Sequence, residues 1–125
     1  MLILDTNFVI AHLGGERETT KLLRLWKQEH ITLAISTVTE CELFAYTKMT
    51  TTEAERISNF LKNYLIIFAF DSIIARRAGK IRQQFPSLKL PDAGIAALAL
   101  EHRAQLVTRN VKDFKKIPNL DLVSF

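Results

Sequence analysis

The sequence predicts an α/β domain built around a largely parallel sheet. Short aliphatic segments, each suited to one strand, alternate along the chain with longer segments in which apolar residues recur at helical spacing. This alternation is typical of β-α-β units with right-handed crossovers. The length of 125 residues and the hydrophobic content of 48% favour a single domain, residues 1–125, with a substantial core.

The first four elements are read from runs of apolar residues. Residues 1–5 form a continuous aliphatic strand, of the kind that is buried on both faces of a parallel sheet. A short helix over 7–13 follows and ends at two glycines, and an amphipathic helix covers 19–28. Residues 31–35 are predicted to form the second strand.

Two capping patterns predict where the next helices begin. Thr37 and Glu40 have the spacing of a capping box, so a helix opens near Ser36. At about 100° per residue, Glu42 lies beside the apolar face of this helix and Glu40 roughly opposite, so we expect Glu42 to approach the core or a cleft and Glu40 to be solvated. A second box, Thr52 with Glu55, opens a helix over 52–64.

The last part of the chain alternates in the same way. Residues 65–70 are a strand candidate, and Asp71 or Ser72 caps the helix that follows. Pro91 suits the first turn of the next helix, which places Asp92 in that turn. Residues 93–100 are small and apolar nearly all round, so this helix is predicted to be buried. The remaining elements are a strand over 106–108, a turn over 109–114 and a strand over 120–123.

The composition argues against several classes of protein. The longest apolar run, 65–70, is far shorter than the roughly 20 residues of a membrane span, and the start does not read as a signal peptide. The single cysteine, Cys41, permits no internal disulfide, which fits a cytoplasmic protein, and it is expected to lie in the core. The net charge of +4 suits a polyanionic partner.

Carboxylates stand where predicted strands end or helices begin. They are Asp5, Glu42, Asp92 and Asp113. The carboxyl ends of parallel strands share one edge of a sheet, which is where ligands bind in such folds. If the first, second and fourth strands are neighbours, the four acids meet and repel one another unless a cation joins them. Mg²⁺ and Mn²⁺ prefer oxygen donors, so the pattern predicts a hard-metal site.

Each of these acids also has an ordinary structural explanation. Asp5 suits a helix N-cap, Asp92 complements a helix dipole, Asp113 fits a turn and Glu42 could pair with an arginine. The histidines are scattered without the spacing of a zinc site and are expected to be surface or packing residues. They are His12, His30 and His102.

Four segments resemble PIN-domain ribonucleases and, among them, the VapC-type toxins of prokaryotic toxin–antitoxin pairs. They are Leu4-Asp5-Thr6-Asn7, Ser36-Thr37-Val38-Thr39 running to Glu42-Leu43, Asp92 with Ile95-Ala96-Ala97, and Val107-Thr108-Arg109-Asn110 running to Asp113-Phe114. The segments occur in the family's order and span nearly the whole chain. The resemblance implies a three-layer α/β/α fold with a central, mostly parallel sheet of four to five strands.

The same resemblance implies a metal-dependent endoribonuclease that cuts phosphodiester bonds in RNA. Asp5, Glu42 and Asp92 would be the core ligands of Mg²⁺ or Mn²⁺ and, with Asp113, the catalytic set. Either Asp113 or Asn110 would complete the metal site. Three polar side chains would orient the carboxylates, namely Thr6, Asn7 and Thr108.

Basic residues near the cleft would hold flanking phosphates of the RNA. Arg109 is the first candidate because it adjoins the site in sequence, and Arg76 and Lys80 follow, with Arg77 and Lys89. The resemblance also implies a homodimer and a small cognate antitoxin that covers the active site. The alternative is a noncatalytic PIN-like module for RNA binding or assembly, which RNA cleavage would separate from the enzyme.

Overall fold

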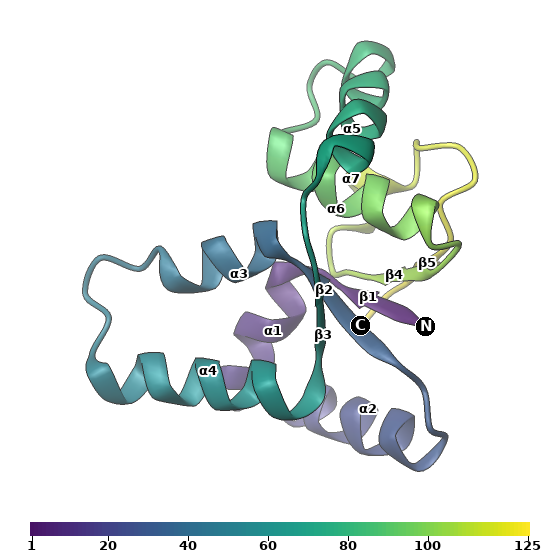
Figure 1. The fold of residues 1–125 in the computed structure, drawn as a ribbon. Helices are drawn as coiled ribbons and strands as arrows, with labels where there is room; N and C mark the ends of the chain where they lie inside the picture. Colours follow the sequence, from purple (N-terminus) through teal and green to yellow (C-terminus); the bar gives the residue numbers. More distant parts are fainter.

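The computed structural model describes residues 1–125 and contains one sheet with helices on both sides (Figure 1). The strands are β1 (Leu2–Leu4), β2 (Leu33–Ser36), β3 (Ile66–Phe68), β4 (Gln105–Val107) and β5 (Leu122–Val123). The helices are α1 (Thr6–Leu13), α2 (Arg17–Gln28), α3 (Thr37–Phe44), α4 (Thr51–Tyr64), α5 (Ser72–Gln84), α6 (Leu90–Glu101) and α7 (Val111–Phe114).

The sheet has the order β3-β2-β1-β4-β5, and every pair of neighbouring strands is parallel. The central strand β1 pairs Ile3 with Ala34 of β2 on one side and with Leu106 of β4 on the other. The first, second and fourth strands are therefore neighbours, which was the condition for the four acids to meet. Their carboxyl ends share one edge of the sheet.

Alternate residues of the central strands enter two separate hydrophobic clusters, as the two-residue period of a strand requires. Ile3, Ala34 and Leu106 pack with α5 and α6, whereas neighbouring strand residues such as Leu4 and Ile35 pack with α1, α2 and α4. Figure 1 shows these two groups of helices on opposite sides of the sheet. The predicted three-layer α/β/α architecture with a parallel sheet is confirmed.

Close packing brings the start of α6 next to α3. A Cβ added at Gly94 would lie 3.0 Å from the nearest ring carbon of Phe70 and 3.5 Å from Cγ2 of Val38. Glycine at this position lets α6 approach both groups. The approach matters for the site because α3 carries Glu42 and the first turn of α6 carries Asp92.

Both predicted capping boxes are wrong. Ser36 caps α3, since its hydroxyl accepts a hydrogen bond from the backbone N–H of Val38, whereas the Thr37 hydroxyl accepts from the N–H of Phe70. The capping box of α4 is formed by Thr50 and Glu53, two residues before the predicted pair. Runs of adjacent threonines and alternating glutamates contain several boxes with the same spacing, and tertiary contacts select among them.

Three further details differ from the prediction. Cys41 is exposed rather than in the core, and Glu42 is exposed while Glu40 is half-buried. The strand candidate 65–70 shortens to β3, an edge strand whose Ile66 is 48% exposed.

None of the helices has the length and hydropathy to span a membrane.

Candidate functional site

The four predicted carboxylates gather at the carboxyl edge of the sheet. Asp5 follows β1 and is the N-cap of α1, Glu42 lies in α3, Asp92 in the first turn of α6 and Asp113 in α7. The backbone N–H of Asp5 donates to the carbonyl of Val107 at 2.9 Å, which joins the ends of β1 and β4. The charges of the other three acids all raise the pKa of Asp92, so the structure brings the four together.

Asp5 is 4% exposed, and only neutral groups donate to its carboxylate. Oδ1 accepts from the backbone N–H of Thr6 at 2.8 Å, and Oδ2 accepts from the Thr108 hydroxyl at 2.6 Å and from the Asn7 amide at 3.0 Å. Burial raises the pKa of Asp5 and the charge of Glu42 raises it further, while the hydrogen bonds lower it. Because Oδ2 already accepts two bonds, Oδ1 is the oxygen with a free lone pair.

Thr6 links Asp5 to Glu42. Its backbone N–H donates to Asp5, and its hydroxyl donates to Oε1 of Glu42 at 2.6 Å. The hydroxyl of Thr39, which is fully buried, lies 3.1 Å from that of Thr6. Glu42 is thus exposed but tethered at one oxygen, and its second oxygen has no hydrogen-bond partner within the protein.

Asp92 and Asp113 line a cleft of about 280 Å³ at the same edge. Its other lining residues come from the loop before α6 and from the segment around α7, and they are Ser87, Leu88, Lys89, Asn110 and Lys116. Burial raises the pKa of Asp92 to about 6, helped by the charges of Asp5, Glu42 and Asp113, while Lys89 lowers it. The Asn110 amide donates to Asp113 at 2.9 Å.

This raised pKa predicts a pH-dependent stability. The pKa of Asp92 is about 6 in the fold against an ordinary value of 3.8, so between these values the folded state holds a proton that the unfolded chain has lost. The free energy of unfolding therefore falls as pH rises through this window. We expect Asp92→Asn to match the wild type near pH 4 and to exceed its free energy of unfolding by about 1–2 kcal/mol at pH 7, after allowance for partial exposure.

The measurement is urea unfolding of both proteins across this pH range. Asp121→Asn is a matched control, because Asp121 is exposed and precedes β5 at the opposite edge of the sheet. A difference between Asp92→Asn and the wild type that is constant with pH would contradict the assigned cause.

The donor chemistry of the site suits a hard cation. The protein contains two ion pairs, Arg77–Glu101 and Arg109–Glu16, so none of the four acids is neutralised by a basic side chain within 4.0 Å. No three carboxylate, imidazole or thiol groups form a ready-made chelating cluster. Magnesium does not require such a cage, because it keeps several waters and binds through one or two carboxylates. The oxygens with free lone pairs on Asp5 and Glu42, together with Asp92, fit this mode of binding.

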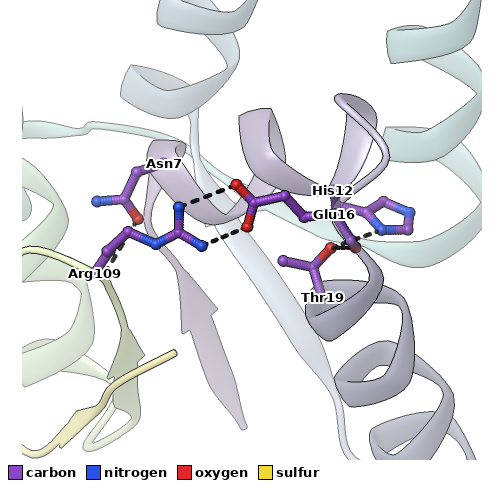
Figure 2. Close-up of polar contacts among 5 residues, drawn as sticks. All are labelled: Asn7, His12, Glu16, Thr19 and Arg109. Carbon is purple, nitrogen blue, oxygen red and sulfur yellow. Dashed lines mark hydrogen bonds and ion pairs between the residues drawn. The ribbon is translucent and has the colours of Figure 1, made fainter.

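Arg109 is held away from the acids. Its guanidinium makes two hydrogen bonds to Glu16, at 3.1 and 2.5 Å (Figure 2). The guanidinium also lies 4.3 Å from the ring centre of Phe125. The backbone N–H of Arg109 donates to the side-chain Oδ1 of Asn7 at 3.4 Å. Glu16 directly follows the Schellman turn that ends α1, in which Gly15 has a φ of 88° and the backbone N–H of Glu16 donates to the carbonyl of Ala11.

Of the other predicted phosphate-binding residues, Lys89 lines the cleft with Asp92 and Asp113, whereas Arg76, Arg77 and Lys80 lie elsewhere. Arg76 and Lys80 line a hollow on α5 together with Glu101, which ends α6. Glu101 is about 13 Å along the helix axis from Asp92, at 1.5 Å per residue. The structure therefore does not bring Arg76 and Lys80 to the acids. Sequence reasoning missed Glu16 and Lys116, because no motif marks a residue whose partner is remote in sequence.

Comparison with known proteins places the fold in a family. The PIN domain family model matches residues 2–120. A toxin–antitoxin complex from Klebsiella pneumoniae contains a chain with 35% identity and a TM-score of 0.81, with 98% of this chain and 96% of that chain covered. No curated protein matches the sequence closely enough to add to the comparison.

Two further structures show the same architecture. VapBC2 from Rickettsia felis, bound to a promoter DNA fragment, has a chain with 26% identity, a TM-score of 0.86 and coverage of 99% and 98% of the two chains. DNA-bound VapBC from Salmonella typhimurium has 21% identity, a TM-score of 0.85 and coverage of 98% and 96%, a likeness of fold alone. The chain therefore belongs to the PIN domain family, as a member of the VapC type.

Proposed function

We propose that this protein is a metal-dependent endoribonuclease that hydrolyses phosphodiester bonds in RNA, and that it is the toxin of a VapBC-type toxin–antitoxin pair in the cytoplasm. The observation that carries the proposal is the gathering of four carboxylates without basic partners at the carboxyl edge of a PIN-domain sheet. Such a cluster is costly to maintain unless a cation binds there.

Each polar residue of the site has a role in this proposal. Asp5, Glu42 and Asp92 hold Mg²⁺ or Mn²⁺, and Asp113 completes the site. Asn110 orients Asp113, to which its amide donates a hydrogen bond. A further set of hydrogen bonds orients Asp5 and Glu42, and its donors are Thr6, Asn7 and Thr108.

A bound divalent cation supplies a water of lowered pKa and neutralises charge that develops on the phosphate. The contribution of the chain is to present ionised oxygens in a fixed arrangement. Asp5 is fixed by three hydrogen bonds and Glu42 by one. Asp92, with its pKa raised to about 6 by burial and the neighbouring acids, is mostly ionised at pH 7.

The proposed partners are a cognate antitoxin, a second copy of the chain and RNA. The Klebsiella pneumoniae structure is described as a toxin–antitoxin complex, and its likeness to this chain at 35% identity supports a cognate antitoxin here. A homodimer is proposed on the family pattern alone. RNA is the proposed substrate. Outside the four site acids, the chain has seventeen basic residues and nine acidic ones, and this excess of positive charge suits a polyanion.

The test incubates the purified protein with a structured RNA in Mg²⁺ or Mn²⁺ and, separately, in EDTA. We expect cleavage with either metal and none in EDTA. Cleavage that continues unchanged in EDTA would contradict the proposal. RNA binding without cleavage under every metal condition would instead favour the noncatalytic module.

A further inference from the structure

We infer that Lys89 and Lys116 form a phosphate-binding rim on the Asp92 side of the cleft and hold the RNA backbone next to the bond that is cut. The inference rests on the proposed function, because it names how the substrate of that site is held. It assigns the RNA path to the face formed by the start of α6 and the end of α7, rather than to Arg109 or to α5.

The two lysines line one cleft although they are far apart in sequence. Lys89 is the N-cap residue of α6, and Lys116 follows α7. Both line the cleft that contains Asp92 and Asp113. The ammonium of Lys116 lies 3.4 Å from the Ser87 hydroxyl, in the loop that leads to Lys89. The rim is therefore formed by two converging segments.

Neither lysine is paired with a carboxylate. Both are exposed, and neither forms an ion pair with a carboxylate within 4.0 Å. The nearest aromatic ring to the Lys116 ammonium is that of Phe85, with its centre 6.0 Å away, which limits where the side chain lies without neutralising it. Two ammonium groups without carboxylate partners beside a cluster of acids are placed to bind an anion that the acids alone would repel.

Two of the other predicted phosphate-binding residues, Arg109 and Arg77, are already paired with carboxylates. The Arg109 guanidinium has its donors directed at Glu16 and its face on Phe125. Figure 2 shows it turned toward Glu16 at the start of α2. Arg77 pairs with Glu101 at the far end of α6. Lysines act as mobile point charges toward phosphate, which suits a rim that follows a flexible single strand.

The cleft is small, which limits the ligand. A volume of about 280 Å³ lies near the lower end of the range for small-molecule sites, which is room for one nucleotide unit. We take the ligand class to be a single-stranded RNA backbone, whose flexibility matches the mobile side chains of the two lysines. A phosphate held between Lys89 and Lys116 would lie in the cleft that Asp92 and Asp113 also line.

The experiment measures binding of a fluorescent single-stranded RNA of about ten nucleotides in EDTA at several salt concentrations. The proteins are the wild type, Lys89→Gln, Lys116→Gln and the double variant, with Lys80→Gln as the matched control on α5. We expect each rim substitution to weaken binding about threefold. Each should also reduce the slope of log K against log salt by about 0.7, and the double variant should show about the sum of the two reductions. Lys80→Gln is expected to leave both quantities unchanged.

The outcomes separate this inference from the proposed function. With cleavage measured in Mn²⁺, the rim substitutions should raise KM and leave kcat unchanged. Rim variants that bind like the wild type, or a Lys80→Gln variant that weakens binding as much, would overturn the inference even if the wild type cuts RNA. A wild type that binds RNA with the expected slopes but never cuts it would overturn the proposed function alone. Failure of the wild type to bind RNA would overturn the rim.

Discussion

Replacement of Asp92 by asparagine is expected to reduce RNA cleavage by more than about a hundredfold. Even the loss of a residue that only hydrogen-bonds a metal ligand typically lowers metal affinity or activity about 10–100-fold. The same substitution should stabilise the protein at pH 7, because burial and three neighbouring acids oppose the charge of Asp92 and raise its pKa to about 6. A variant that is better folded and inactive would show that this charge is maintained for function.

Single-turnover cleavage with Mn²⁺ and urea unfolding at pH 7 measure the two effects. Asp121→Asn repeats the chemistry at an exposed aspartate beyond the site and should cut RNA like the wild type. Cleavage by Asp92→Asn within tenfold of the wild type would remove Asp92 from the catalytic set. An unfolding free energy below that of the wild type would show that its charge does not destabilise the fold.

Asp5→Asn is expected to lose cleavage to a similar extent but to destabilise the protein. Three donors point at the Asp5 carboxylate, one at Oδ1 and two at Oδ2. An asparagine amide has one oxygen, so whichever way it turns, its NH₂ group faces at least one donor. The Thr108 hydroxyl gives little relief, because its oxygen already accepts from the N–H of Asn110 at 3.0 Å.

The cost of a buried donor left without an acceptor is about 1–3 kcal/mol, partly offset by the removal of a buried charge. The stability changes of Asp5→Asn and Asp92→Asn should therefore have opposite signs, while both variants are inactive. Thermal unfolding of the two side by side checks this. If Asp5→Asn proves as stable as Asp92→Asn, the hydrogen bonds described for Asp5 do not hold it.

The architecture was predictable because it depends on local patterns. Buried parallel strands are continuous aliphatic runs, and the helices between them repeat apolar residues at helical spacing. The meeting of the acids was predictable for the same reason, since Asp5 follows a strand, Asp92 lies in the first turn of a helix, and Glu42 lies beside the apolar face of the helix that follows the second strand. The neighbouring order of β2, β1 and β4 completed it.

The features that the sequence did not predict depend on contacts between residues that are close in space, and local sequence patterns do not reveal such contacts. The Thr50–Glu53 box and the competing Thr52–Glu55 spacing look alike in sequence, and packing chooses between them. Arg109 adjoins the site along the chain, yet its partner Glu16 lies 93 residues earlier. Lys116 carries no motif and enters the cleft only because the chain turns after α7.

The central claim is that the four carboxylates share a site for a divalent cation. The most direct test measures Mn²⁺ binding by isothermal titration calorimetry. The wild type should show saturable binding that weakens about fivefold from pH 6 to pH 5, as Asp92, with its pKa of about 6, takes up its proton. Asp5→Asn and Asp92→Asn should lose this binding, whereas Asp121→Asn should keep it. Binding of equal strength in the wild type and Asp92→Asn, or none in the wild type at pH 7, would contradict the account.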